Sequence, residues 1–544
     1  MGSQTLVVHV HYHLLRPLVL SVVEHNLRSS DIQAMSNATL NTSELYADGV
    51  LARPPKSDPW LAAGYGVLLG ACFSVWVLAI RAPFWVDETL SYWQIAGGFK
   101  QIWTRSVQGN SFAAYAYILW LTNGLFGNSE VVLRIPSVLA MLAAVYVFYR
   151  CARMLFAWDV ALIATVFFML PRAIAFAAID VRPYAFALLL SNLTILAFLR
   201  WTKTTKTIYS ALMGASAAGI IYFHYLFATV LVALAIYYLL TRGLSKMKAD
   251  LPQTAIALGC FVILLLPVLP RLWYIYQTRV EHSSANAPRF LAVLHVLNPG
   301  KGQWFVLAGV VLMAAVVRGL AISRREVWTK LLLCLSLTLV PILSLYAISV
   351  MSSVHIFLPR YLLAAAPGIA LCWGWFSSCI KLRPLRGLFC LAFAALCTLQ
   401  AYGSVAAYKH EVSWKGALAF ADENASRDHA PLLMCSPLVE ADFQPMPAEA
   451  KESVLYAPLI YYKVKSPVVP LPRTLNEEAD RQVRQFLQLA AQEHLRFLVL
   501  APGQSVPIAD LLASYSQGSY SSRVLGVFDN EIMVVEFTPY SEAH

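Results

Sequence analysis

The sequence carries little charge for its length. Of its 544 residues, 13% are Asp, Glu, Lys or Arg, whereas a soluble protein carries about 25%. Hydrophobic residues make up 58% of the chain, and the mean hydropathy is +0.60. This composition excludes a soluble protein, because uncharged runs recur that are long enough to cross about 30 Å of hydrocarbon. The sequence therefore predicts an integral membrane protein.

A continuous basic stripe is also missing, although the net charge is +11. The Lys and Arg residues instead form short clusters between the apolar blocks. These clusters are Arg200/Lys203/Lys206, Arg242/Lys246/Lys248, Arg324/Arg325/Lys330 and Lys381/Arg383/Arg386. Cytoplasmic loops of membrane proteins show this bias, whereas a DNA-binding protein gathers its basic residues on one face. We therefore expect no nucleic-acid partner.

Motifs that would bind metals, form disulfides or hold nucleotides are absent as well. The nine cysteines include no CxxC pair and no His/Cys metal spacing. No convincing Gly-rich nucleotide loop is present. His9, His11 and His13 alternate near the start of the chain, and we assign them no function. We predict no metal site and no required cofactor, and we leave open a need for a divalent metal.

The sequence does contain a series of apolar blocks, which predict a polytopic α-helical membrane protein with about eleven transmembrane helices. The single-span blocks lie at 60–80, 131–150, 157–177, 183–200, 252–270, 303–322, 329–351, 361–380 and 387–408. The uncharged run 208–240 is too long for one span and lies between two basic clusters. It should therefore cross twice, with a turn near 222–225. This topology puts the N-terminus inside and the C-terminus outside.

Three domains follow from the composition. Residues 1–59 form a poorly ordered cytoplasmic extension, with Met35 as an alternative start of the chain. Residues 60–408 form the membrane domain, which has a long first external loop over 81–130. Residues 409–544 form a small extracytoplasmic α/β domain, which we expect to recognise substrate or cap the site. Its patterns predict helices at 414–425 and 476–494 and strands at 432–435, 496–500, 524–528 and 532–537, the last two around an Asp529-Asn530 turn.

Acidic residues mark two turns on the external side. Asp87 and Glu88 follow the first span, where adjacent carboxylates are costly unless they are used. The alternative is a solvated pair in a loop. Asp180 and Arg182 precede a proline that starts the next helix, and the alternative there is a structural salt bridge or an interface anchor.

Basic residues mark two further turns on the same side. Arg360 lies where the chain re-enters the membrane, and its guanidinium could bind a lipid phosphate. It could equally reach to the headgroups without a specific ligand. His224, between Phe223 and Tyr225, is the weakest candidate, because such a residue is more often a hydrogen-bonded interface histidine.

Taken in order, these motifs resemble the GT-C polyprenyl-phosphate-sugar glycosyltransferases. The resemblance covers 60–414 and is greatest to the bacterial branch related to protein O-mannosyltransferases and the lipid A aminoarabinose transferase. It rests on Trp85-x-Asp87-Glu88, on the run Leu125-Phe126-Gly127-Asn128-Ser129-Glu130-Val131-Val132-Leu133-Arg134-Ile135-Pro136-Ser137, on Asp180-Val181-Arg182-Pro183-Tyr184 and on Pro359-Arg360-Tyr361.

The resemblance implies a set of site residues. The catalytic base would be Asp87, with Glu88 beside it and Asp180 as a second acidic residue. The groups that hold the donor and its lipid phosphate would be Arg182, Tyr184, His224, Arg360 and Tyr361. One departure concerns the acceptor, since 111–115 lacks the prolines that relatives often have in this loop.

The implied activity is a membrane glycosyltransferase of the hexosyl or pentosyl type. It would move a sugar from a polyprenyl-phosphate donor to a hydroxyl of a glycan, lipid or protein acceptor, with inversion and with an Asp as general base. The site would face the exterior of a bacterial inner membrane. A transporter or flippase of a lipid-linked saccharide is the alternative, although we find no internal repeat of the kind that transporters show. A non-catalytic scaffold is a second alternative.

Overall fold

The computed structural model describes residues 59–204, 206–242, 251–280, 286–297, 325–380, 382–411, 414–443, 453–474, 476–502, 506–515, 518–528 and 532–540. The chain divides into two units, Met1–Pro59 and Trp60–His544. The predicted N-terminal extension with its three histidines and Met35, the span at 303–322 and the Asp529-Asn530 turn lie outside the described residues. The predicted division into three domains stays a prediction.

Apolar helices make up most of the second unit, as the sequence predicts. They are α4 (Pro59–Ala79), α8 (Glu130–Leu155), α9 (Trp158–Met169), α10 (Arg172–Ile179), α11 (Tyr184–Trp201), α12 (Thr207–His224), α13 (Thr229–Arg242), α14 (Leu251–Leu265), α15 (Leu269–Gln277), α16 (Phe290–Leu297), α18 (Arg325–Met351), α19 (Ala366–Ser378) and α20 (Arg383–Glu411). Among the described residues, five helices are long and apolar enough to cross a membrane, or six if α9 and α10, bent by 72°, count as one span. The predicted count of about eleven is not confirmed.

The uncharged run predicted to cross twice contains a break at the predicted place. By length and composition, Thr207–Thr241 counts as one apolar run, but the 3₁₀ turn η2 (Tyr225–Ala228) separates α12 from α13. Near its start, α11 stacks Phe186 on Phe223 of α12, with 4.9 Å between ring centroids. Near its end, α11 places Phe198 5.9 Å from Tyr237 of α13. Because α12 ends and α13 begins at the same end of α11, the two helices run in opposite directions.

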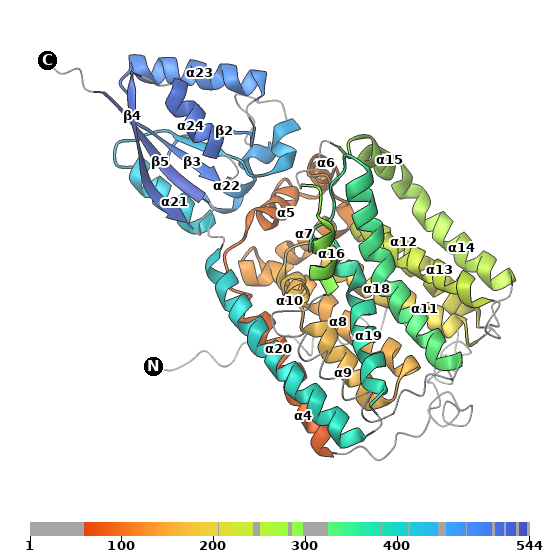
Figure 1. Ribbon diagram of the computed structural model, residues 1–544. Helices are drawn as coiled ribbons and strands as arrows, with labels where there is room; N and C mark the ends of the chain where they lie inside the picture. Colours follow the sequence, from red (N-terminus) through yellow and green to blue (C-terminus); the bar gives the residue numbers. More distant parts are fainter. Residues whose placement is uncertain are drawn as a thin grey trace, which may run out of the picture. The chain divides into compact units, whose positions relative to one another are not determined.

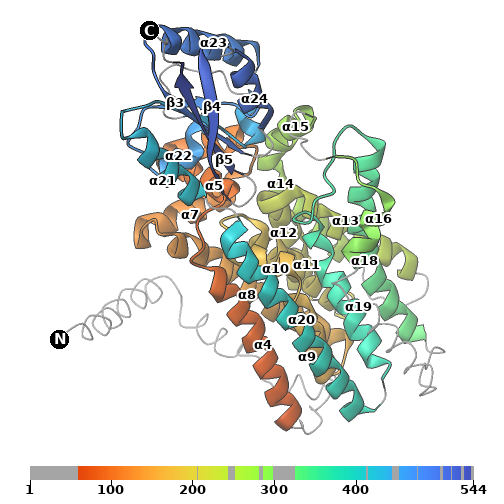
Figure 2. The ribbon, with the colours of Figure 1, turned by 60° about the vertical axis from the view of Figure 1, so that its left-hand side comes forward.

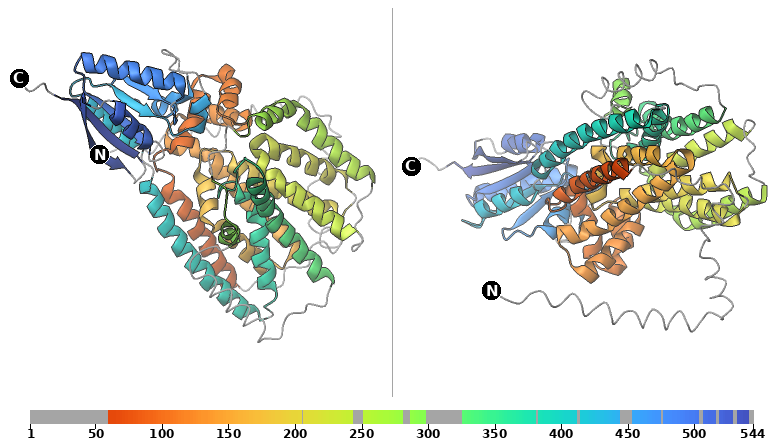
Figure 3. Two further views of the ribbon diagram at one scale, coloured as in Figure 1. Left: turned by 45° about the horizontal axis from the view of Figure 1, so that its top comes forward. Right: turned by 90° about the horizontal axis from the view of Figure 1, so that it is seen from below.

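Helix packing brings distant parts of the chain together. Helix α11 packs on α8 and α12, and α18 packs on α19 and α13. Helices α4 and α20 lie side by side in every view, although they are far apart in sequence (Figures 1, 2 and 3). A buried ion pair between Arg386 and Asp159 ties α20 to α9.

The loop 81–130, predicted to be external, is largely helical. It contains α5 (Val86–Ala96), η1 (Phe99–Gln101), α6 (Ile102–Gln108) and α7 (Ala113–Phe126). Helix α5 begins where the Glu88 carboxylate accepts a hydrogen bond from the backbone N–H of Trp85, at 3.3 Å. This bond caps the helix and fixes its first turn. Asp87 therefore projects from a defined helical turn and not from a loose loop.

The C-terminal region has the predicted α/β character. Its elements are α21 (Trp414–Ala425), β1 (Leu432–Cys435), η5 (Val439–Phe443), η6 (Val454–Tyr456), α22 (Ala457–Tyr461), β2 (Val468–Leu471), α23 (Glu477–Gln492), β3 (Phe497–Pro502), α24 (Val506–Tyr515), β4 (Tyr520–Phe528) and β5 (Ile532–Pro539). The sheet order is β2-β1-β3-β5-β4. Strand β1 pairs in parallel with β2 and β3, and β5 is antiparallel to its two neighbours. The sequence did not predict β2 or α24.

Each face of this sheet has its own core. Alternate strand residues point to opposite faces, so Leu432 and Met434 pack with α21, whereas Leu433 and Cys435 pack with α23 and α24. Leu90 and Trp93 of α5 are part of this second core, and α22 packs directly on α5. The helix that carries Asp87 is thus built into the C-terminal domain.

Candidate active site

A cavity of about 270 Å³ lies where the turns predicted to be external meet the C-terminal domain. Its lining comes from six places along the chain: α5, the loop between α6 and α7, the turn before α11, the end of α12 with η2, the turn before η4 (Leu362–Ala365), and the C-terminal domain. The lining includes six residues predicted from sequence, which are Asp87, Arg182, Tyr184, His224, Arg360 and Tyr361.

Asp87 sits between the two predicted arginines. Its Oδ2 atom accepts a hydrogen bond from Nη1 of Arg360 at 2.9 Å, and the two side chains are 15% and 34% exposed. Nη1 of Arg182 lies 3.5 Å from the backbone carbonyl oxygen of Asp87. A carboxylate and two guanidiniums from three distant turns therefore share one partly accessible cavity.

Aromatic rings line the floor beside the arginines. The imidazole of His224 lies 5.2 Å from the ring of Tyr184 and 5.2 Å from that of Tyr361. The guanidinium of Arg360 lies 5.3 Å from the centroid of the Tyr361 ring. In the part of the chain that the structure describes, the Nε atoms of Arg182 and Arg360 are buried and have no hydrogen-bond partner. Buried donors without partners are costly, and both arginines line the cavity.

Glu88, predicted as catalytic, does not line the cavity. Its carboxylate is 1% exposed and accepts hydrogen bonds from Nε of Arg134 at 2.9 Å and from Nη2 at 2.6 Å. It also accepts from the backbone N–H of Val181 at 3.0 Å. Arg134 in turn donates to the carbonyl oxygens of Ile80 and Ala82. This geometry favours a structural role, in which Glu88 joins α5, α8 and the turn that carries Arg182.

Asp180, the other predicted acidic residue, is also absent from the lining. It is 2% exposed, and its Oδ1 atom accepts a hydrogen bond from the indole Nε1 of Trp85 at 3.1 Å. Burial raises the pKa of Asp180 well above its usual value, and the nearby Glu88 raises it further. The geometry favours a role in holding Trp85, and with it the start of α5.

We expected the C-terminal domain to recognise substrate or cap the site, but no residue of that domain was predicted as part of it. Glu440 of η5 and Arg473 both border the cavity. Burial raises the pKa of Glu440 to about 7; the Asp87 charge also raises this pKa, while Arg182 and Arg360 lower it. A single Glu in a short turn belongs to no sequence motif that would predict a role in the site. Only its position in the folded chain relates it to Asp87.

The loop between α6 and α7 forms another unpredicted part of the lining. Arg271 of α15 stabilises this loop through hydrogen bonds. The guanidinium donates to the carbonyl oxygens of Ser111 at 3.3 Å and Val107 at 3.2 Å, and to Oδ1 of Asn110 at 3.4 Å. Asn110 has a positive φ of 46°, which is uncommon for a non-glycine residue. Because this loop contains no proline, Arg271 supplies contacts that fix its shape.

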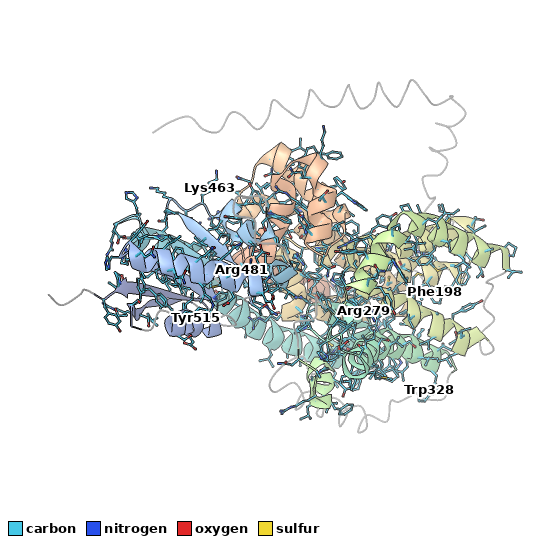
Figure 4. The ribbon with its side chains drawn as sticks, turned by 90° about the horizontal axis from the view of Figure 1, so that it is seen from above. Phe198, Arg279, Trp328, Lys463, Arg481 and Tyr515 are labelled. Carbon is cyan, nitrogen blue, oxygen red and sulfur yellow. The ribbon has the colours of Figure 1, made fainter. Side chains whose placement is uncertain are left out.

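We expect Arg271→Ala to lower the free energy of unfolding by about 1–3 kcal/mol, because buried carbonyl groups lose a charged donor. Thermal and denaturant unfolding of the purified protein would measure the change. Arg279→Ala is the matched control, since Arg279 lies just beyond α15 and is exposed (Figure 4). The control should change stability by less than about 0.5 kcal/mol. Equal effects of the two substitutions would contradict a clamping role.

No metal centre is evident in the described ranges, where no group of three or more His, Cys, Asp or Glu side chains could hold an ion.

Comparisons with known proteins agree with this architecture. Residues 113–274 match the family of dolichyl-phosphate-mannose-protein mannosyltransferases. The fold is similar to that of ArnT from Cupriavidus metallidurans in the apo state, with a TM-score of 0.52 and 13% identity over 87% of this chain and 98% of that one. It is also similar to the same protein bound to undecaprenyl phosphate (TM-score 0.49, 13% identity, 86% and 97% covered). The arabinofuranosyltransferase AftD from Mycobacteria gives 0.45, with 14% identity over 90% of this chain and 40% of that one. No curated protein sequence matches the chain.

The described apolar helices are those of an integral membrane protein, and residues 113–274 are similar to a family of mannosyltransferases.

Proposed function

We propose that this protein transfers a sugar from a polyprenyl-phosphate donor to an acceptor hydroxyl, with inversion, in the cavity beside Asp87. The proposal includes a site that faces the extracytoplasmic side of the membrane. The observation that carries it is the convergence of the Asp87 carboxylate with the guanidiniums of Arg182 and Arg360 in one cavity. This arrangement contains a base and a place for an anionic leaving group.

Lipid phosphate is the leaving group that fits these residues. Planar guanidiniums bind phosphate oxygens with good geometry, and both Arg182 and Arg360 line the cavity. The description of the matching family names a dolichyl-phosphate-linked mannose, and ArnT has been solved with undecaprenyl phosphate. These observations support a polyprenyl-phosphate donor.

Asp87 is the group placed to accept the proton. Its Oδ2 atom is bonded to Arg360, and a phosphate that draws Arg360 toward itself would free that oxygen for the acceptor hydroxyl. The acceptor oxygen then bonds to the anomeric carbon as the bond from that carbon to the phosphate oxygen breaks. The bonding electrons leave with the phosphate, and the hydroxyl proton moves to Asp87. A single displacement of this kind inverts the anomeric centre.

The two arginines would stabilise the negative charge that develops on the leaving phosphate. Fixed donors aimed at developing negative charge stabilise the transition state more than the ground state. Arg182 and Arg360 are held at the ends of distant elements, and Arg360 also lies against the ring of Tyr361. Glu88 and Asp180 contribute indirectly, because they position the start of α5 and the turn that carries Arg182.

Replacing both arginines by alanine should weaken binding of a polyprenyl monophosphate by about tenfold to a hundredfold or more, because a hydrogen bond to a charged group contributes about 1.5–3 kcal/mol. Titration of the purified protein with the lipid in detergent would measure this loss. Arg484→Ala is a matched control, since Arg484 pairs with Asp480 on the surface of α23. The KM for the donor should rise more than the KM for the acceptor. Equal increases in the two KM values would contradict a phosphate clamp.

A further inference from the structure

The extramembrane domain places one carboxyl group in the cavity. Glu440 belongs to η5, between β1 and η6, and it borders the same cavity as Asp87, Arg182 and Arg360. Its side chain is partly buried. The charges of all three of these residues affect its pKa, so the carboxyl lies within electrostatic reach of each of them. The proposed reaction does not yet use this group.

The segment that carries Glu440 is firmly held on both sides. Leu438 is buried in the same core as Trp93 of α5, and its backbone N–H donates to Oγ of Ser436 at 3.3 Å. On the other side, Oδ1 of Asp442 accepts from the backbone N–H of Thr474 at 2.8 Å. The position of Glu440 relative to α5 is therefore set by packing and hydrogen bonds.

The electrostatic surroundings of Glu440 are mixed. Asp87 is the anionic neighbour, Arg182 and Arg360 are the cationic ones, and Arg473 also borders the cavity but pairs with Asp442 at 3.4 Å. Burial and the Asp87 charge outweigh the arginines and raise the pKa of Glu440 to about 7. Near neutral pH this group can therefore be present as an uncharged acid, which is a hydrogen-bond donor.

We propose that Glu440 contacts the lipid phosphate of the donor as a carboxylic acid and donates a hydrogen bond to one of its oxygens. This inference rests on the proposed function, because it takes the phosphate to lie at Arg182 and Arg360. An ionised Glu440 would instead repel the phosphate, since like charges in one cavity disfavour each other. A carboxyl kept neutral by its surroundings is a known way to supply such a donor.

The hydrogen bond from Glu440 would assist the transfer step, and Glu440 would keep its proton throughout. The acceptor proton moves to Asp87, the bond from the anomeric carbon to the phosphate oxygen breaks, and the phosphate gains charge. The hydrogen bond from Glu440 becomes stronger as that charge grows, while the proton remains on Glu440. The C-terminal domain would thereby contribute one donor to the leaving group.

The proposal requires a linkage between phosphate binding and pH. A bound phosphate favours the protonated form of Glu440, so the pKa of Glu440 rises on binding and binding weakens as pH passes above about 7. A rise of one pKa unit corresponds to about a tenfold loss of affinity at high pH. The second ionisation of the phosphate itself, near pH 6, must be separated from this effect.

The experiment is to measure the Kd of a polyprenyl monophosphate for the purified full chain in detergent, at about pH 6 and about pH 8.5. The variants are wild type, Glu440→Gln and Glu478→Gln. The E440Q amide keeps the shape, donates a hydrogen bond and does not titrate. Glu478 is exposed in the first turn of α23 and serves as the control. Thermal unfolding confirms that each variant is folded.

We expect wild type and E440Q to bind equally at the low pH, and E440Q to bind about tenfold more tightly than wild type at the high pH. E478Q should follow wild type. If the ratio of wild-type to E440Q affinity does not change with pH, the assignment of Glu440 is wrong. If the lipid binds just as well after both arginines are replaced, the proposed function itself fails. The two failures are thus distinguishable.

Discussion

Asp87→Asn is expected to lower the rate of sugar transfer by a factor of about 10² to 10⁴, the usual contribution of a general base. Asparagine keeps the shape of the side chain and can still accept a hydrogen bond from Arg360, which lies 2.9 Å away in the wild type. It cannot take the proton of the acceptor hydroxyl. Binding of polyprenyl phosphate should persist, because both arginines remain.

Transfer of radiolabelled sugar from a purified lipid donor would measure this effect. Asp480→Asn provides the control, since Asp480 forms a surface pair with Arg484 and does not line the cavity. If Asp87→Asn transfers sugar at nearly the wild-type rate, Asp87 is not the base. If wild type moves labelled lipid across vesicles without transferring its sugar, the transporter reading replaces the enzymatic one.

Glu88→Gln should have the largest effect on stability, with a loss of about 3–5 kcal/mol in the free energy of unfolding. The substitution leaves the Arg134 guanidinium buried at 1% exposure without a counter-charge. Removing one partner of a buried pair is costly because the remaining ion cannot be solvated. The loss should be visible as a lower Tm for the purified protein.

A double variant tests whether the pair is structural. Replacing both Glu88 and Arg134 with uncharged residues of similar size should recover part of the stability, because no unpaired ion then remains. Removing the partly exposed pair of Lys415 and Glu130, at 3.6 Å, should cost only about 0–1 kcal/mol. If Glu88→Gln keeps full stability but abolishes transfer, the structural role is wrong and Glu88 acts in the chemistry.

Local patterns in the sequence predicted much of the fold. The helix at 414–425 and the strand at 432–435 match α21 and β1 residue for residue, because apolar periodicity and uniform burial are local signals. Strand β2 was not predicted, since its four residues include Pro470 at the edge of the sheet, and proline argues against a strand. The number of spans was less predictable, because bending between α9 and α10 and the short α19 do not show in hydropathy.

The candidate site was partly predictable for a different reason. Charged residues at the ends of apolar runs stand out against an uncharged background, which identified Asp87, Arg182 and Arg360. Their individual roles depend on long-range contacts. The two neighbouring carboxyls of Asp87 and Glu88 look alike in sequence, yet one faces the cavity and the other is buried against Arg134. The sequence did not pair Glu88 with Arg134, or Glu440 with Asp87, because each partner lies on a separate element.

The shared core of α5 and the C-terminal sheet also limits how this protein can be dissected. Leu90 and Trp93 fill space beneath the sheet, and the backbone N–H of Phe84 donates to the hydroxyl of Tyr462 at 2.6 Å. A chimera that exchanges the C-terminal domain for that of a relative must therefore also exchange the matching face of α5. Likewise, an isolated fragment of the C-terminal domain would expose to water the apolar surface that Leu90 and Trp93 cover. Helix α5 and the C-terminal sheet therefore form one packing unit, and an exchange of either one alone would leave part of that core without its partner.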